Sequence, residues 1–537
     1  MDPGAGRGVR MLAFLRMATS LMDRGAAAAP AGARFDRESV LADYRTAFKS
    51  RHASLIGRTE VLTGKAKFGI FGDGKEVAQV AMAHAFRKGD FRSGYYRDQT
   101  LMFALGLLAI EQFFAQLYAD PDLAAEPCSA GRSMTAHFST SLLAADGSFR
   151  ELSELLNSAA DVSPTGSQMP RLVGLAYASR LYRELPELAG MTRFSQHGDE
   201  VAWGTIGNAS CAEGMFWEAV NAVGVLRSPM LLSIWDDGYG ISVPNEYQIA
   251  KPDLSELLSG FRRAPGSREG YDLYRVRGWD YPALRETYER AAETVRREHV
   301  PAIVHVAEMT QPQGHSTSGS HERYKSKERL AWEVEFDGIS KMREWLVAEG
   351  YAAPAELDAL EAQDLAEVRE RRRAAWESFR APIEEERREV LEMIGRLAAE
   401  SRARDEIEAV RRELERQPIA LRRDLAGAVA SALIANAGEQ TPAARRLVEW
   451  KRRSDETNRA RYSSHLHVDT AGSALRVPAV AARYAGEAPL VNGFEVLNAC
   501  FDAALARLPN LIALGEDVGQ IGDVNQGFAG LQAEFLL

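Results

Sequence analysis

The chain has 537 residues, of which 46% are apolar and 26% are charged, and its net charge is −10. This composition excludes a wholly disordered chain, a collagen and a disulfide scaffold, because a chain of this length can bury several cores. The acidic balance argues against nucleic acid or an anionic membrane as the main partner. The sequence has no run of ~18 apolar residues, so no transmembrane helix is predicted.

The cysteines and the N-terminal sequence bear on the cellular compartment of the protein. The three cysteines lie far apart and form no CxxC pair, which predicts a reducing compartment, and we expect a cytoplasmic protein. Within residues 1–34, positions 1–33 carry four arginines and an Ala/Gly/Pro tail without a core-forming pattern. We expect a disordered tail there, and a transit peptide is the alternative.

The remaining chain divides into three parts. Residues 35–342 alternate helix-like and strand-like segments with glycine-rich turns, which is typical of an α/β domain. Residues 343–487 form a charged helical region to about Arg423, followed by a connector of small, mixed residues. Residues 488–537 contain a predicted helix, a short buried strand LIALG (511–515) and a turn-rich loop. So small a unit cannot close a core alone, so it either docks on another unit or lacks the rest of a domain.

The most informative segment predicts a βαβ unit. VAWGTI (201–206) and MLLSIW (230–235) read as buried strands, and the helix between them begins near Glu213. Because the loops after parallel strands meet at one edge of a sheet, Asn208 and Asp237 should lie close together. Their oxygens, beside a helix start that favours phosphate, suit Mg²⁺. The alternative is an Asn-capped turn and a plain Asp-Asp-Gly surface turn.

Five segments in chain order carry a family resemblance. Gly207-Asn208-Ala209 with Asp236-Asp237 is similar to a thiamine diphosphate signature, and GYGISVP (238–244) extends it. The other four segments are GYYRDQ (94–99), GRSMTAHF (131–138), SPTGSQMPRLVGLAYA (163–178) and QGHSTS (313–318). Together they resemble the E1 alpha subunits of 2-oxoacid dehydrogenases of the branched-chain and pyruvate types. The resemblance implies a thiamine-diphosphate-binding fold, a parallel sheet flanked by helices.

The resemblance also implies a set of site residues. It places Mg²⁺ on Asn208, Asp237 and the Tyr239 carbonyl, and a monovalent cation near Ser167 and Gln168. It gives catalytic roles to His315 and His137. The alternative for each is a histidine that is structural or has no function. Ser316 aligns with a phosphorylation position of some relatives, and a hydrogen-bonding loop serine is the alternative we favour. The implied cofactor-binding residues are Tyr96, Arg97, Ser163, Thr165, Gly207, Asn208, Ala209, Asp237, Tyr239 and His315.

Three departures from the family pattern stand out. The usual acidic and Asn metal ligands are exchanged, as Asn208 and Asp237, which leaves the charge of the ligand set unchanged. Trp235 and Gln311 occupy positions where the family often has arginine, which puts cofactor affinity in question.

The C-terminal segment 489–535 resembles the beginning of an E1 beta subunit, so we expect an alpha portion fused to a partial beta portion. Glu516 and Asp517 match an early beta motif and not the glutamate that activates the aminopyrimidine. We therefore expect this chain alone to be incomplete as an enzyme, and to act as a homodimer or with a partner that supplies the beta portion.

The implied function is oxidative decarboxylation of a 2-oxoacid, with transfer of the acyl group to a lipoyl group of an E2 acyltransferase. A branched-chain substrate, 3-methyl-2-oxobutanoate, is favoured, which implies branched-chain amino acid catabolism, and pyruvate is second. The alternatives are another thiamine diphosphate enzyme, acetoin-cleaving or transketolase-like, and a catalytically inert E1-like subunit with a role in assembly.

Overall fold

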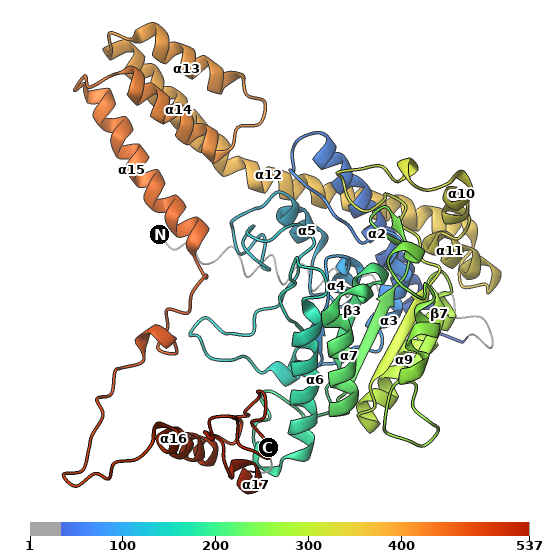
Figure 1. Cartoon of the computed structure of the whole chain (residues 1–537). Coiled ribbons are helices and arrows are strands. Elements are labelled where there is room, and N and C mark those ends of the chain that lie inside the picture. The colour runs from blue at the N-terminus through green and yellow to red at the C-terminus, as the bar shows by residue number, and fades with distance from the viewer. Residues whose placement is uncertain (1–33, 536–537) are drawn as a thin grey trace, which may run out of the picture.

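A six-stranded parallel sheet lies at the centre of the N-terminal part of the chain (Figure 1). The computed structural model describes residues 34–535. The strand order is β2, β1, β3, β4, β8, β7, and every neighbouring pair is parallel. This confirms the predicted α/β class. The strands are β1 (Phe91–Ser93), β2 (Asn157–Ser158), β3 (Ala202–Gly207), β4 (Met230–Trp235), β7 (Asp272–Arg277) and β8 (Ala302–Ala307), and a separate hairpin pairs β5 (Tyr239–Gly240) with β6 (Val243–Pro244).

Helices cover both faces of this sheet. Along β4 the side chains alternate, so that Leu231 and Trp235 pack into the core beneath α3 (Glu76–Ala83) and α9 (Tyr281–Glu298). Leu232 and Ile234 point the other way, into the core beneath α6 (Gln168–Glu184) and α7 (Gly214–Leu226). A sheet buried on both faces explains why its strands read as continuous apolar runs.

The predicted βαβ unit is confirmed. β3 and β4 pair in parallel from Ala202 opposite Met230, and α7 connects them. The buried stripe of α7 is Phe216, Ala219, Val220 and Val223, which has helical spacing. The close fit of α6 on the sheet depends on Gly204, because a Cβ there would lie 2.3 Å from Leu172 Cδ2.

The other helices of the α/β region, which we define as residues 35–348, surround this core. They are α2 (Arg37–Leu62), α4 (Gln99–Ala104), α5 (Ile110–Leu117), α8 (Leu254–Leu257), α10 (Lys327–Glu335) and α11 (Gly338–Ala348). The predicted domain end at residue 342 falls inside α11. Predictions for residues 1–34 lie, apart from Arg34, outside the described residues.

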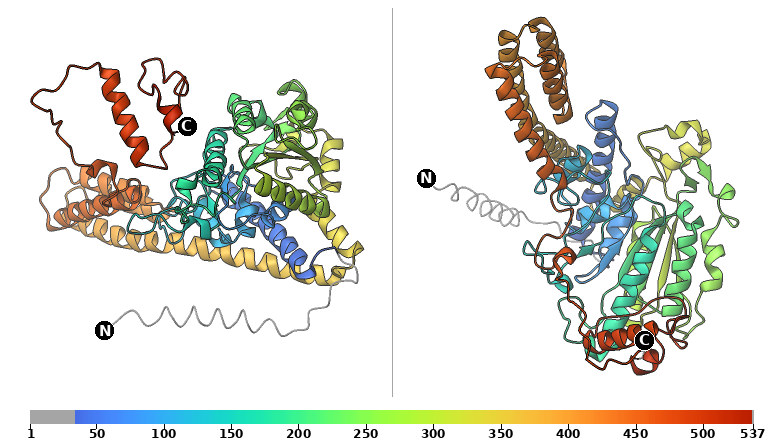
Figure 2. Two further views of the ribbon diagram at one scale, coloured as in Figure 1. Left: turned by 90° about the horizontal axis from the view of Figure 1, so that it is seen from below. Right: turned by 60° about the vertical axis from the view of Figure 1, so that its left-hand side comes forward.

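A helical arm projects from the α/β region (Figures 1 and 2). The 47-residue helix α12 (Pro354–Glu400) packs along α2 and α5, and its outer part forms the arm with three more helices. These are α13 (Arg404–Arg416), α14 (Arg422–Ala435) and α15 (Pro442–Ser463). Long charged helices are thus confirmed, but the connector expected from residue 424 is wrong up to residue 463. The reason is that Leu425, Val429, Ala432 and Leu447 recur at helical spacing and are buried in the arm's core.

The end of α15 returns to the α/β region. Arg132 Nε donates to the Tyr462 carbonyl at 3.1 Å, and Arg132 Nη2 donates to the Arg461 carbonyl at 3.4 Å and to Ser464 Oγ at 3.1 Å. These acceptors include carbonyls of the last turn of α15, which have no partners within a helix. Arg132 belongs to the segment GRSMTAHF, so the arm is joined to a loop that sequence analysis places at the site.

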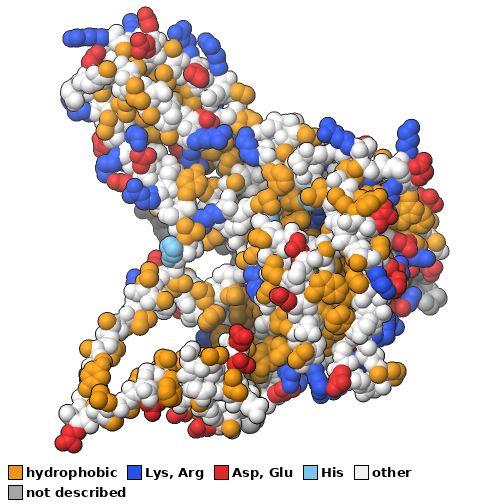
Figure 3. Space-filling model, viewed as in Figure 1, with side chains coloured by type: hydrophobic (Ala, Val, Ile, Leu, Met, Phe, Trp, Pro, Cys, Tyr) orange, Lys and Arg blue, Asp and Glu red, His pale blue; other side chains and the backbone are white. Residues whose placement is uncertain are grey.

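The C-terminal segment, residues 464–535, is mostly exposed. Residues 464–492 are irregular apart from the three-residue 3-10 helix η7 (Ala474–Arg476), and apolar side chains of this segment lie in solvent (Figure 3). Leu475 is 91% exposed. The predicted helix is confirmed as α16 (Gly493–Arg507), and the short α17 (Leu531–Phe535) follows. The strand predicted at 511–515 is wrong, because no strand of the described residues pairs with it. None of the helices within residues 34–535 is long and apolar enough to cross a membrane.

Candidate functional site

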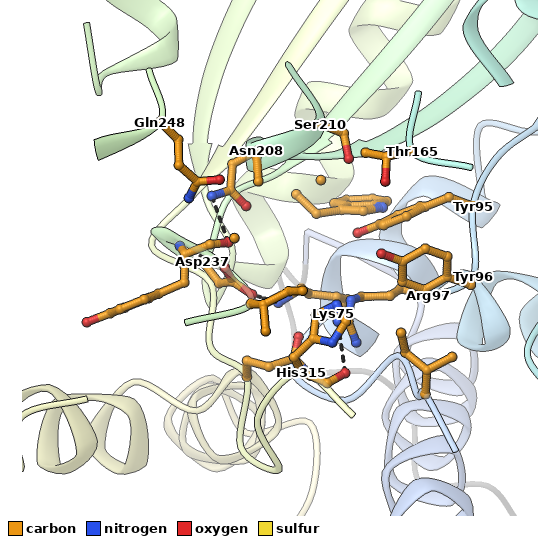
Figure 4. A pocket seen from close by; sticks show the side chains of 18 of the residues that line it. Lys75, Tyr95, Tyr96, Arg97, Thr165, Asn208, Ser210, Asp237, Gln248 and His315 are labelled. Carbon is orange, nitrogen blue, oxygen red and sulfur yellow. Dashed lines mark hydrogen bonds and ion pairs between the residues drawn. The ribbon is translucent and has the colours of Figure 1, made fainter. Parts of the chain in front are cut away.

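A cavity of about 460 Å³ lies at the carboxyl ends of β3, β4 and β8, the edge where open α/β sheets bind ligands (Figure 4). All ten residues expected to bind the cofactor line it, although they come from segments spread over more than 200 positions. They are Tyr96, Arg97, Ser163, Thr165, Gly207, Asn208, Ala209, Asp237, Tyr239 and His315. Trp235 and Gln311, the two departures from the family pattern, line the same cavity.

The three expected metal ligands are neighbours. Asn208 Nδ2 donates to the Tyr239 carbonyl at 3.1 Å, and the Tyr239 amide donates to Asp237 Oδ1 at 3.2 Å. A carboxylate, an amide oxygen and a carbonyl are hard ligands, which suits Mg²⁺ completed by phosphate oxygens. Within residues 34–535 no cluster of three His, Cys, Asp or Glu side chains could hold a metal, so any ion here depends on this mixed set.

A chain of hydrogen bonds fixes the orientation of Asn208. Asp236 Oδ1 accepts from Asn245 Nδ2 at 3.1 Å, and Asn245 Oδ1 accepts from Asn208 Nδ2 at 2.6 Å. Because an ionised carboxylate can only accept, Asn245 presents its NH₂ to Asp236 and its oxygen to Asn208. Asn208 must therefore turn its NH₂ toward Asn245, which leaves its Oδ1 for a ligand.

The far side of Asp236 is held as well. His305 Nε2 lies 3.0 Å from Asp236 Oδ2, and His305 Nδ1 lies 2.7 Å from Ser255 Oγ. His305 is on β8 and Ser255 is on α8, so the central sheet and a covering helix both position the loop after β4.

Lys75 is a site residue that sequence analysis missed. Its Nζ donates to Asp237 Oδ2 at 2.8 Å and to the Thr310 carbonyl at 2.8 Å, and its side chain is 1% exposed. Gly74 permits this approach, since a Cβ there would lie 2.0 Å from the Thr310 carbonyl oxygen. The available signal was FGDGKE, a glycine-rich turn with a lysine at the start of a helix, which is a common setting for phosphate.

Lys75 and Asp237 alter each other's titration. Burial lowers the pKa of Lys75, and the Asp237 carboxylate offsets only part of this effect. Burial alone would raise the pKa of Asp237, but the charge of Lys75 and its hydrogen bond, with Arg97 and Lys325, hold that pKa below its ordinary value. Asp237 is therefore a carboxylate across the neutral pH range and can bind a cation.

Arg97 joins two loops of the cavity wall. Its Nη1 donates to the Phe71 carbonyl at 2.6 Å, and its Nη2 donates to the His315 carbonyl at 3.1 Å. The guanidinium also lies 5.5 Å from the Tyr96 ring centroid. Arg97 thus positions the loop that carries His315, in addition to placing a positive charge beside the cavity.

His315 is neutral at physiological pH. Burial, and then the charge of Arg97, lower the pKa of its imidazole to about 4. A neutral imidazole has one nitrogen that accepts and one that donates a proton, as a residue that moves protons requires. Its neighbour Ser316 is buried and bonds Ser318 Oγ at 2.7 Å, as a structural loop serine does.

His137 lies behind the cavity wall. Its Nδ1 is 3.2 Å from the Thr135 carbonyl and its Nε2 is 2.9 Å from Ser163 Oγ. Since the carbonyl can only accept, Nδ1 carries a proton, and in the neutral ring Nε2 accepts from Ser163 Oγ. The preceding Ala136 has φ of 63°, a strained conformation for a residue with a Cβ. The ring therefore positions Ser163, and a direct catalytic role for His137 stays a prediction.

The expected monovalent cation site lies at the start of α6. Gln168 is buried, and its Nε2 donates to the Thr205 carbonyl at 2.9 Å. Ser167 precedes α6. The cation near these two residues stays a prediction.

Comparison with known proteins gives a consistent result. The sequence model of the family "Dehydrogenase E1 component" matches residues 44–384, more than half of the chain. The chain is 28% identical to 2-oxoisovalerate dehydrogenase subunit alpha of Bacillus subtilis (strain 168) over 270 residues, which are 50% of this chain and 69% of the relative. It is 24% identical to pyruvate dehydrogenase E1 component subunit alpha of Acholeplasma laidlawii over 357 residues, 65% of this chain and 87% of that protein. For the human mitochondrial 2-oxoisovalerate dehydrogenase subunit alpha the identity is 25% over 291 residues, 54% of this chain and only 56% of the relative.

Proposed function

The chain belongs to the dehydrogenase E1 component family, and from that premise we propose that it takes part in the oxidative decarboxylation of a 2-oxoacid with thiamine diphosphate and Mg²⁺. The observation that carries the proposal is the convergence of the ten expected residues on one cavity at the carboxyl edge of the sheet. A branched-chain 2-oxoacid is our first choice of substrate and pyruvate the second, following the names of the relatives.

Thiamine diphosphate, when bound, supplies a carbon nucleophile and an electron sink for loss of CO₂ from a 2-oxoacid. Asn208 Oδ1, Asp237 and the Tyr239 carbonyl would hold Mg²⁺ at the diphosphate. Ser163 and Thr165 would line the side that faces the pyrimidine ring and the substrate. The neutral imidazole of His315 would exchange a proton with the substrate oxygen at that side.

The acyl group would pass to a lipoyl group of an E2 acyltransferase. We propose that a beta portion completes the site, either as a separate partner or within a homodimer. The names of the relatives support this, because they are alpha subunits. The division at residues 342 and 487, with a beta-like unit from residue 488, remains our proposal for the domain organisation.

The test is calorimetric titration of the full-length chain with thiamine diphosphate, with and without Mg²⁺. We expect Asp237→Ala to abolish metal-dependent binding while the far-ultraviolet circular dichroism stays unchanged. Wild-type affinity in that variant would refute the metal assignment. Absence of any metal-dependent binding by the wild-type chain would favour the inert E1-like subunit with a role in assembly.

If binding is observed, turnover identifies the reaction. Decarboxylation of 3-methyl-2-oxobutanoate and of pyruvate is compared with a dye as the electron acceptor, in the presence of the beta partner. Preference for acetoin or a ketose donor would instead indicate another class of thiamine diphosphate enzyme. We expect His315→Ala to slow acyl transfer more than it weakens cofactor binding, and lost binding with unchanged turnover at saturation would contradict its role.

A further inference from the structure

Three polar side chains that no part of the proposed function uses lie together in the cavity: Lys75, Trp235 and Gln311. We propose that their N–H groups bind the diphosphate of the cofactor, so that this chain holds the anion with a lysine, an indole and an amide. The proposal rests on the proposed function, because it assigns further residues to the same site.

The fold brings the three residues to the same cavity from three different elements. Trp235 is the last residue of β4, and Gln311 follows its neighbour β8 in the sheet. Lys75 opens α3 and reaches across to both loops, because its Nζ bonds Asp237, two residues after Trp235, and Thr310, next to Gln311. The ammonium group therefore lies between the two loops that carry the other donors.

Two of these side chains are buried without a partner. Trp235 is 1% exposed and Gln311 is 4% exposed, yet Trp235 Nε1 and both polar atoms of the Gln311 side chain make no hydrogen bond within the described chain. Buried polar groups are nearly always bonded, because leaving one unpaired is unfavourable. Both residues line the cavity, so a molecule in the cavity is the partner that their position allows.

Lys75 also has a hydrogen-bond donor that is not used. An ammonium group has three N–H donors, and two of them are used by Asp237 and Thr310. The third has no acceptor among residues 34–535. Among residues 34–535 the carboxylate that pairs with this buried ammonium is Asp237, which is also an expected metal ligand.

The chemistry of the three groups selects an anion with several oxygens. An indole and an ammonium can only donate, and the Gln311 amide adds two N–H groups beside one accepting oxygen. A diphosphate offers many acceptors and negative charge, and Lys75 with Arg97 supplies positive charge on the same wall. A neutral ring, such as the pyrimidine, offers too few acceptors for this set.

The experiment measures affinity for inorganic pyrophosphate, thiamine diphosphate and thiamine by calorimetry on the full-length chain. Lys75→Met, Trp235→Phe and Gln311→Leu each remove the donors and keep the approximate side-chain volume. We expect Lys75→Met to weaken both phosphate ligands by about 100-fold, and the other two by about 10-fold each, because these are hydrogen bonds to a charged acceptor. Binding of thiamine, which lacks the phosphates, should not change.

Two controls separate binding from folding. Lys251→Met removes an exposed lysine that pairs with Glu256 away from the cavity, and it should bind as the wild type does. Lys75→Arg keeps the charge and should recover part of the affinity. Thermal unfolding of each variant shows whether it is folded, and Trp235→Phe with Gln311→Leu still tests the proposal if Lys75→Met does not fold.

The outcomes distinguish this inference from the proposed function. Unchanged pyrophosphate affinity in all folded variants would overturn the inference and leave the function standing. Binding of pyrophosphate that depends on these residues, without binding of thiamine diphosphate, would refute the function and, with it, the assignment of this anion site to the cofactor. A wild-type chain that binds none of the phosphate ligands would overturn both.

Discussion

Two apolar segments of this chain, MLLSIW (230–235) and LIALG (511–515), have opposite structures. The first is β4, fully buried, with β3 on one side and β8 on the other. The second is irregular, and its Leu514 is 79% exposed. A strand gains little stability from its own sequence alone and depends on neighbouring strands that complete its hydrogen bonds. The α/β region supplies those neighbours, and the described part of the C-terminal segment does not.

The largest effect is expected from breaking a buried ion pair at the sheet, between Asp90 and Arg296. Asp90 is fully buried, and its carboxylate accepts from both terminal nitrogens of Arg296 and from the Trp203 indole. We expect Asp90→Ala to lower the free energy of unfolding by about 3–5 kcal/mol, because it leaves a buried guanidinium unpaired. Urea titration followed by circular dichroism measures the loss. Glu516→Ala, in the exposed segment, is the control and should change it by less than about 0.5 kcal/mol.

The two apolar segments can be compared directly by the same truncation. We expect Ile234→Ala in β4 to cost about 2–5 kcal/mol, since it leaves a cavity between the sheet and α6 and α7. Ile512→Ala should cost less than about 0.5 kcal/mol, because Ile512 is exposed already. Equal losses in urea titration would show that the C-terminal segment is packed in solution.

Ligand binding should stabilise only one of the two regions. Thiamine diphosphate with Mg²⁺ at 100 times its Kd is expected to raise the unfolding free energy of the α/β region by about 2.7 kcal/mol. The rate at which trypsin cleaves the exposed irregular chain after Arg476 or Arg483 should not change. Slower trypsin cleavage at these sites in the presence of the ligand would contradict the expected independence of the two regions. It would place the C-terminal segment at the cavity.

The smallest expected effect is a pH dependence of the α/β region. Burial lowers the pKa of His299 to about 4, and its Nε2 bonds the Gly198 carbonyl. As pH falls below about 6.5 the unfolded chain binds a proton that the folded chain refuses, so stability falls until about pH 4. At pH 5 this amounts to about 2 kcal/mol relative to pH 8. Urea titrations of His299→Gln at both pH values should show a smaller difference than wild type, whereas His467→Gln, in the exposed segment, should show the same difference.

The parts of the fold that depend on local pattern could be predicted from the sequence. The strands predicted at 201–206 and 230–235 have continuous apolar runs because both faces of the sheet are covered. The ten cavity residues were identified through motifs, each of which holds its residues a few positions apart. α14 was missed because its alanine-rich sequence gives a weak helical pattern. α15 was missed because its sequence is mostly charged or polar and its few buried residues lie in its first turns.

Contacts over long sequence distances could not be predicted. Lys75 meets Asp237 across 162 positions, and nothing in either segment indicates the other. The orientation of Asn208 depends on Asn245 and Asp236, whose pairing exists only after the loops are folded. The strand expected at 511–515 was wrong for the same reason, because pairing partners lie outside the local sequence.

The attachment of the arm has a mechanical consequence. At about 1.5 Å per residue, the 47 residues of α12 span about 70 Å, so a tilt of one degree at one end moves the other end by about 1 Å. A single long helix held at one end would amplify small movements. Here α15 leads back and Arg132 bonds its end, so the arm is fixed at two separated points. Bending the arm therefore pulls on the segment 131–138, and a force applied at its tip reaches the loop that carries His137.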